Sequence, residues 1–244
     1  MEIQLGFSTG CLYESGLHER KKLELVAAAG CKVVELGFVK LADFLGKQLA
    51  QFAVLTTADF APFDYVSLHA PIYAYGHDKQ TERIFNLIRN FHISIGFLDL
   101  VIFRPDTVQD FSVFENRGFP VAFENMDNRK PKCKTPPEML DIFSQIEDAR
   151  MVLDVNHAFT MDIDDAECRL TSDFWQKLYP WIDQIHLSGY APPEHNHWPL
   201  FKTKQDFIIR SIENFTKPII IESVLTPDEL AQERDHVLSV ISDQ

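Results

Sequence analysis

Three carboxylates and one histidine occupy matching places in a repeated sequence pattern. Glu124, Asp154 and Glu222 each end a short apolar run, and His186 lies near the end of another. Carboxylate oxygens with one imidazole and no thiolate form a ligand set that suits Mn, Mg, Co, Fe or Zn. One such residue alone would more often be a helix cap or an ion-pair partner. All four in one place would repel one another without a cation, so together they predict a divalent-metal site.

Four further histidines could extend this site. His69 ends an apolar run, His157 comes three residues after a run-ending aspartate, and His195 and His197 lie in a proline-bracketed segment. Imidazole nitrogens can bind a second metal ion or donate hydrogen bonds to a substrate. The alternative is that they are ordinary polar residues of exposed loops, and the sequence leaves both interpretations open.

Arg104 ends a further apolar run, in Ile-Phe-Arg-Pro. Arginine cannot ligate a cation, but its planar fork binds phosphate or carboxylate through two parallel hydrogen bonds. We therefore expect Arg104 to point into the site and to bind an anionic substrate. A salt bridge to a neighbouring acid such as Asp106 or Glu124 is the alternative.

The elements that must position these residues are eight short runs dense in Val, Ile, Leu and Phe. The runs are residues 3–8, 32–36, 65–69, 98–103, 120–124, 150–154, 183–187 and 218–222. Such runs are typical of strands that are buried on both faces of a parallel sheet. Amphipathic segments lie between them, with apolar residues at helical spacing in Ile84, Leu87, Ile88, Phe91 and Ile95.

The alternation of strands and helices predicts an α/β fold, and its length and rhythm favour a (β/α)8 TIM barrel. An open doubly wound sheet shares the same local signals. Because no Gly/Ser-rich or low-complexity linker interrupts residues 1–244, we expect a single domain. In a closed parallel barrel the carboxyl ends of the strands converge on one mouth, which would bring the candidate residues together. The irregular segments 73–78, 125–134, 156–165 and 189–202 all follow strands and should surround that mouth.

Two helix starts carry a chemical signature. Thr135 and Thr226 each precede a proline, and each lies three residues before a glutamate, Glu138 and Glu229 respectively. This arrangement is a capping box with proline in the first helical turn. We expect a helix to follow each of the two threonines.

The composition narrows the class of protein. The chain has 45% hydrophobic and 24% charged residues, as an ordinary soluble protein does. A formal net charge of -13 without a basic stripe disfavours a nucleic-acid partner. The N-terminus has no signal-peptide pattern and no apolar stretch is long enough to span a bilayer, so we expect a cytoplasmic protein with no membrane partner. Cys11, Cys31, Cys133 and Cys168 show no CxxC spacing and should be reduced thiols.

Five motifs resemble the xylose isomerase-like TIM barrel superfamily, which contains sugar-phosphate isomerases and epimerases, ketose 3-epimerases and endonuclease IV. They are Val-Ser-Leu-His-Ala-Pro (66–71), Val-Ala-Phe-Glu-Asn (121–125), Val-Leu-Asp-Val-Asn-His-Ala (152–158), Gln-Ile-His-Leu-Ser (184–188) and Ile-Ile-Ile-Glu-Ser (219–223). The order of the motifs and their placement at strand ends make the resemblance specific. It extends from the first predicted strand to the last.

The resemblance to the epimerase branch implies roles for individual residues. Glu124, Asp154, His186 and Glu222 match a tetrad that holds one divalent metal, and the two glutamates of that tetrad also act as acid and base. His157 matches a histidine that contacts the substrate. This branch commonly supplies an arginine shortly after the tetrad histidine, and the present chain has none there.

The resemblance to the endonuclease IV branch implies a zinc cluster with additional ligands. These would be His69, His157, a histidine at the end of the fourth strand and an Asp-x-His pair after the seventh. Arg104 stands at the fourth-strand position, and His195-Asn196-His197 replaces the pair. Because the fixed charge of arginine repels a cation, a full three-zinc cluster is not expected.

Three functions from different classes are consistent with these residues. The leading hypothesis is a metal-dependent isomerase or epimerase of a small sugar, sugar phosphate or related polyol or keto acid, which works by metal-assisted proton transfer. The second is an endonuclease IV-like metal-dependent phosphoester hydrolase. The third is a barrel that binds a ligand without turnover, because fold does not fix function.

Overall fold

In residues 3–38, 40–96, 98–192 and 195–243, which the computed structural model describes, eight short parallel strands close into a barrel. The barrel strands are β1 (Leu5–Ser8), β2 (Val33–Gly37), β3 (Tyr65–His69), β4 (Leu100–Phe103), β5 (Val121–Glu124), β6 (Arg150–Asp154), β7 (Ile182–Leu187) and β10 (Ile219–Ile221). Their order around the barrel is β1-β10-β7-β6-β5-β4-β3-β2. Each lies within or overlaps a predicted run, so the α/β TIM-barrel prediction is confirmed and the open sheet is excluded.

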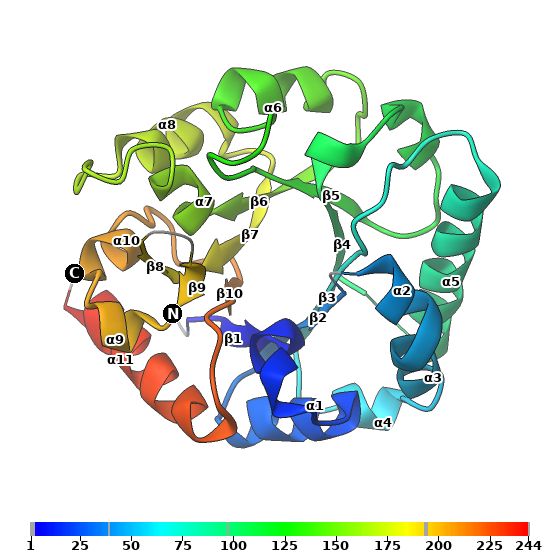
Figure 1. Ribbon diagram of the computed structural model, residues 1–244, viewed down its shortest axis with the longest axis horizontal. Coiled ribbons are helices and arrows are strands. Elements are labelled where there is room, and N and C mark those ends of the chain that lie inside the picture. The colour runs from blue at the N-terminus through cyan, green and yellow to red at the C-terminus, as the bar shows by residue number, and fades with distance from the viewer. Residues whose placement is uncertain (1–2, 39, 97, 193–194, 244) are drawn as a thin grey trace.

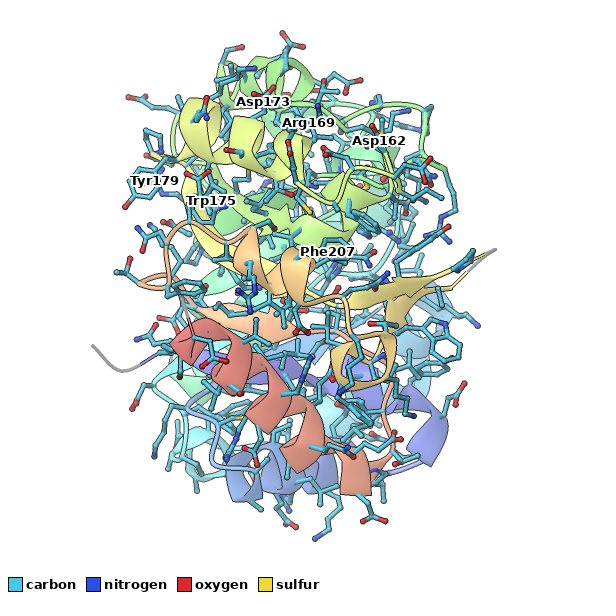
Figure 2. All side chains as sticks on the ribbon, turned by 90° about the vertical axis from the view of Figure 1, so that its left-hand side faces the viewer. Asp162, Arg169, Asp173, Trp175, Tyr179 and Phe207 are labelled. Carbon is cyan, nitrogen blue, oxygen red and sulfur yellow. The ribbon has the colours of Figure 1, made fainter. Side chains whose placement is uncertain are left out.

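Helices form a ring outside the strands (Figure 1). The longer ones are α1 (Glu19–Ala28), α5 (Lys79–Ile95), α6 (Pro136–Phe143), α8 (Arg169–Leu178) and α11 (Leu230–Ser242). Shorter helices are α2 (Leu41–Asp43), α3 (Leu49–Phe52), α4 (Thr57–Phe60), α7 (Val155–Phe159), α9 (Leu200–Thr203) and α10 (Asp206–Arg210). Short 3-10 or π turns are η1 (Thr9–Ser15), η2 (Phe44–Gln48), η3 (Pro105–Thr107), η4 (Phe111–Phe114) and η5 (Pro227–Glu229). In the side view of Figure 2, Trp175 and Tyr179 of α8 and Phe207 of α10 lie in this outer layer.

The predicted capping boxes are both present. Thr135 and Glu138 cap α6, with their side chains bonding each other's backbone N–H groups. Thr226 and Glu229 do the same at η5, which leads directly into α11. Since capping satisfies N–H groups that the first helical turn leaves unpaired, these residues determine where the two helices begin.

Side chains alternate between the inside and the outside of each barrel strand, and this alternation decides which residues reach the mouth. Ala122 and Val152 belong to a small apolar cluster with Leu100 and Ile102. Glu124 and Asp154 come two residues after Ala122 and Val152 on their strands, so they face the same way. The acidic groups therefore lie at the barrel mouth, above this small apolar cluster.

Two of the segments expected to be irregular contain regular structure. The segment after β6 begins with α7, and the segment after β7 folds into a hairpin of β8 (Gly189–Ala191) and β9 (His195–Trp198). Figure 2 shows the hairpin extending beyond the barrel on one side. Both segments nevertheless follow strands, so they lie on the mouth side as expected.

Two further observations concern the class of protein. All four cysteines are buried and unpaired, as expected for reduced thiols. Among the residues described, no helix is both long and apolar enough to cross a membrane.

A substitution at Gly6 tests how closely β1 and β2 pack in the barrel wall. A Cβ at this position would lie 1.8 Å from the carbonyl oxygen of Val33, so the backbone of β1 or β2 would have to move. We expect Gly6→Ala to lower the free energy of unfolding by about 3 kcal/mol or more, as measured by urea denaturation, because overpacking that displaces backbone is at the costly end of its range.

Gly76→Ala is the matched control. A Cβ there would meet only the side chain of Gln109, whose Oε1 atom at 3.0 Å can rotate away. Its effect should stay within about 1 kcal/mol. A Gly6→Ala protein as stable as this control would contradict the close approach of β1 and β2.

Candidate metal centre

Four neighbouring strands bring the predicted tetrad together. Glu124, Asp154, His186 and Glu222 each offer one ligand atom, and these atoms all lie within 4.8 Å of one another. The first three side chains are buried, and Glu222 is 15% exposed. The residues come from β5, β6, β7 and the end of β10, which are consecutive in the barrel. Closure of the sheet therefore creates the cluster.

Asp154 is held from two directions. The side chain of Asn125 donates to the carbonyl oxygen of Asp154 at 2.9 Å and accepts from its backbone N–H at 2.8 Å. One carboxylate oxygen, Oδ1, accepts the N–H of His157 at 2.8 Å and so caps α7. The other oxygen, Oδ2, is buried without a hydrogen-bond partner. A buried oxygen with an open lone pair at the centre of the cluster is what a cation ligand requires.

His186 joins the cluster to a carboxylate that sequence reasoning missed. Its Nδ1 atom is 2.7 Å from Oε1 of Glu124 and 3.5 Å from Oε2 of Glu222. On the other side of the ring, Nε2 donates to Oε2 of Glu35 at 2.8 Å. Gln184 donates its amide N–H to the same oxygen at 2.8 Å. Glu35 interrupts the apolar run Val-Val-Glu-Leu on β2, and a charged residue inside such a run was the signal that could have found it.

The electrostatics of the cluster leave protons on several ligands. Burial, together with the charges of Glu124 and Glu222, holds the pKa of Asp154 well above its ordinary value. Burial and the charge of Glu35 raise the pKa of Glu222 to about 7, against the opposing charge of His186. Burial would lower the pKa of His186, but the carboxylates that surround it raise this pKa well above its ordinary value. Burial would likewise raise the pKa of Glu124, but the facing histidines hold it well below its ordinary value.

Three of the other predicted histidines line the same mouth. A cavity of about 240 Å³ opens over the cluster and is lined by His69, His157 and His197 among others. Nε2 of His69 lies 3.5 Å from Oε2 of Glu124, and Nδ1 of His197 lies 3.7 Å from Oε2 of Glu222. Burial lowers the pKa of His157 against the opposing charge of Glu124, and burial is also the main cause that lowers the pKa of His197 to about 3. Both rings are therefore neutral near pH 7 and can bind a metal or accept a hydrogen bond.

The two histidines of the mouth loops are held differently. His157 donates through Nδ1 to the carbonyl oxygen of Asn125 at 2.9 Å, and its Nε2 is buried without a partner. His197 has a φ of 69°, a left-handed backbone conformation that non-glycine residues rarely adopt. Such strain persists where surrounding structure enforces it, often at functional sites. The backbone of His195 lies in β9, while its side chain falls outside the part of the chain that the structure describes.

Arg104 also lines the cavity. It follows Leu100 and Ile102 at two-residue spacing on β4, which gives it the inward direction of those interior residues. Asp106 pairs with Lys130 instead, at 3.6 Å. Among the described residues the Arg104 guanidinium forms no ion pair, and its Nε atom is buried without a hydrogen-bond partner. The salt bridges considered as its alternative are thus not formed.

The residues present fit a divalent cation. Their donor atoms are oxygens and one imidazole nitrogen, one of the oxygens is buried without a partner, and the carboxylates repel one another. A larger depression of about 800 Å³ lies between segments 114–119 and 143–149, which precede β5 and β6. It is therefore at the opposite end of the barrel from the tetrad. Glu124 and Glu222 of the tetrad line the smaller cavity.

Solved structures with the same fold cover nearly the whole chain. A xylose isomerase domain-containing protein from Salmonella typhimurium LT2 superposes with a TM-score of 0.67 and 10% identity over 99% of both chains. A D-psicose 3-epimerase, crystallised in the presence of D-fructose, gives 0.64 and 11% over 97% of both chains. A probable 3-DHS dehydratase from Bacillus anthracis gives 0.65 and 14% over 98% of this chain and 99% of its own. Neither a family profile nor a curated protein sequence matches this chain. The chain therefore shares the TIM-barrel fold of these proteins, in agreement with the resemblance indicated by the sequence motifs.

Proton release tests whether the tetrad binds metal. Because the pKa values of Asp154 and Glu222 are raised, the metal-free cluster holds protons at pH 6 that a ligand set must give up. We expect Mn²⁺ binding to release protons at pH 6. The affinity should rise with pH, about tenfold per pH unit for each proton released, and this rise should become shallower above pH 7, where Glu222 is ionised.

Titration calorimetry at pH 6 and pH 8, in two buffers of different ionisation enthalpy, measures both quantities. Glu222→Gln removes one titrating ligand and should show a weaker pH dependence than the parent protein. Binding heats that are equal in the two buffers, with an affinity that does not change with pH, would show that these carboxylates do not take part.

Proposed function

We propose that the protein is a divalent-metal-dependent isomerase or epimerase of a small sugar, a sugar phosphate or a related polyol or keto acid. The observation that carries the proposal is the convergence of four ligand atoms within 4.8 Å beneath a small cavity. At about 240 Å³ the cavity is below the usual range for drug-sized ligands, which suits a small molecule. The D-psicose 3-epimerase, which shares the fold, supports a sugar as the substrate class.

Glu124, Asp154, His186 and Glu222 would hold the cation. The chemistry that such a cation supplies is Lewis-acid polarisation of a carbonyl oxygen, which acidifies the hydrogen on the neighbouring carbon. Glu124 and Glu222 approach Nδ1 of His186 from different strands. Two carboxylates so placed can take a proton from one face of a substrate carbon and return one to the other face. Return of a proton to the opposite face of the same carbon inverts that carbon. Return to the adjacent carbonyl carbon, with the hydroxyl proton passing to the former carbonyl oxygen, would move the carbonyl along the chain.

The upper part of the cavity would bind the remaining substrate oxygens. The buried Nε2 of His157 has no hydrogen-bond partner, lies 3.9 Å from Oδ2 of Asp127, and can accept a hydrogen bond from a substrate hydroxyl. The unpaired guanidinium of Arg104 can hold a phosphate or carboxylate group. These contacts would orient the reacting carbon between the two glutamates, and orientation contributes strongly to rate.

Glu222→Gln tests the acid/base role. Replacing a ligand that also transfers protons should weaken Mn²⁺ binding and lower kcat at least about 100-fold, because general acid/base catalysis contributes 10²–10⁴-fold. Isomerisation of a panel of ketoses, ketose phosphates and hydroxy keto acids, with and without Mn²⁺, provides the measurement. Glu147→Gln, an exposed glutamate at the far end of the barrel, is the control and should keep full activity. Full activity in Glu222→Gln would rule out the assigned role.

Arg104→Ala tests whether the substrate is an anion. The variant should raise KM about 10-fold or more for a ketose phosphate, since a charged hydrogen bond contributes 1.5–3 kcal/mol, and hardly change it for the neutral ketose. Arg83→Ala removes an exposed arginine elsewhere and controls for the loss of a charge. Equal effects on both substrates would reject the role of Arg104 in anion binding.

A second candidate function is hydrolysis of a small phosphoester. The observation that favours it is the presence of His69, His157 and His197 around one cavity, where they could bind an additional metal. The net charge of -13 disfavours DNA as the substrate, because contacts to phosphates supply most nonspecific affinity. Assaying the same preparations for nicking of abasic DNA and for hydrolysis of a chromogenic phosphodiester separates this function from isomerisation.

A further inference from the structure

We propose that Glu35 is a positioning residue of the metal centre, which holds the His186 ring so that its Nδ1 lone pair faces the cation. The inference rests on the proposed function and adds to it a residue that lines the same cavity and acts through His186. Glu35 lies on β2, two strands beyond β10 around the barrel, and it reaches the tetrad across the interior.

The first argument is burial. Glu35 has no exposed surface and no lysine or arginine partner among the described residues, although a buried carboxylate is costly unless it is paired. Its hydrogen-bond donors are His186 and Gln184, both at 2.8 Å, and Ser67 at 3.4 Å. A carboxylate placed in this way contributes little to packing. We therefore infer that its role is the contact with His186.

The second argument is direction. An ionised carboxylate only accepts hydrogen bonds, so the nitrogen that faces Glu35 must carry a hydrogen. That nitrogen is Nε2. Without a cation Nδ1 also faces a carboxylate, Oε1 of Glu124 at 2.7 Å, so both nitrogens can carry hydrogen, and a cation at the tetrad would displace only the hydrogen on Nδ1. Nδ1 is the atom that faces Glu124 and Glu222. Glu35 therefore selects the form of the ring that can ligate a cation at the tetrad, as carboxylates bonded to metal-binding histidines generally do.

The third argument concerns the orientation of the ring. Gln184 donates to the same oxygen of Glu35, which fixes the position of that oxygen. On one side the His186 ring stacks against His69, with centroids 6.1 Å apart and planes 24° from parallel. The ring is thus held at one edge by Glu35 and along one face by His69. Loss of the Glu35 contact would free it to rotate away from the tetrad.

Two variants of Glu35 test the proposal in the full-length protein. Glu35→Leu removes the acceptor, and Glu35→Gln keeps an acceptor oxygen without the charge. We expect Mn²⁺ affinity, measured by calorimetry, to fall about 10- to 100-fold in Glu35→Leu and by a smaller factor in Glu35→Gln. Ile102→Val is the control, because it trims an interior side chain of the small apolar cluster and leaves the tetrad and the hydrogen-bond donors of Glu35 in place, and its affinity should match that of the parent protein.

A second measurement reports on the ring itself. In the Zn²⁺-loaded protein with ¹⁵N-labelled histidine, the parent should show His186 protonated at Nε2, with a slowly exchanging proton. In Glu35→Leu this proton should exchange faster, whereas a merely structural role would lower the melting temperature and leave this signal and the affinity unchanged.

The outcomes separate the two proposals. If the parent binds no Mn²⁺, the proposed function fails. If the parent binds Mn²⁺ and both Glu35 variants bind it equally well, the role of Glu35 is wrong while the metal centre stands. A loss of affinity in Ile102→Val as large as that in Glu35→Leu would also overturn the inference, because it would reflect general disturbance of the interior.

Discussion

Repulsion among buried carboxylates is the constraint on which this structure depends. Glu35, Glu124, Asp154 and Glu222 surround the imidazole of His186 inside the barrel, above a small apolar cluster. Negative charges this close in a water-poor interior must be neutralised by protons or by a cation. Without a cation, raised pKa values keep protons on Asp154, Glu222 and His186. A divalent ion would replace those protons, which is why metal binding and proton release belong together.

The fold supplies this constraint through simple geometry. A parallel barrel presents all its strand ends at one mouth, and two-residue alternation turns every second side chain inward. Local contacts then refine the positions. Asn125 joins β5 to the backbone of Asp154, and Asp154 caps α7, so that only one of its carboxylate oxygens remains open. The glutamate of β2 reaches His186 from across the interior, and no local sequence pattern describes such a contact.

Most of the fold and the tetrad could be predicted because they depend on local signals. Apolar runs marked the strands, and the tetrad residues stand at or near the ends of these runs. The rest depends on contacts between distant segments. Glu35 contacts His186 because closure of the barrel places β2 across the interior from this histidine. Arg104 has no ion-pair partner among the described residues, and Asp106 pairs with Lys130 instead. The left-handed backbone of His197 likewise arises in a hairpin where the sequence showed only an irregular segment.

Anomalous diffraction from crystals grown with Mn²⁺ tests the metal centre most directly. The account predicts one strong manganese peak within bonding distance of Glu124, Asp154, His186 and Glu222, with Nδ1 as the imidazole ligand. Cavity water or substrate would complete the coordination. No peak at saturating Mn²⁺, or a peak bound by other residues with the tetrad carboxylates unchanged, would contradict it.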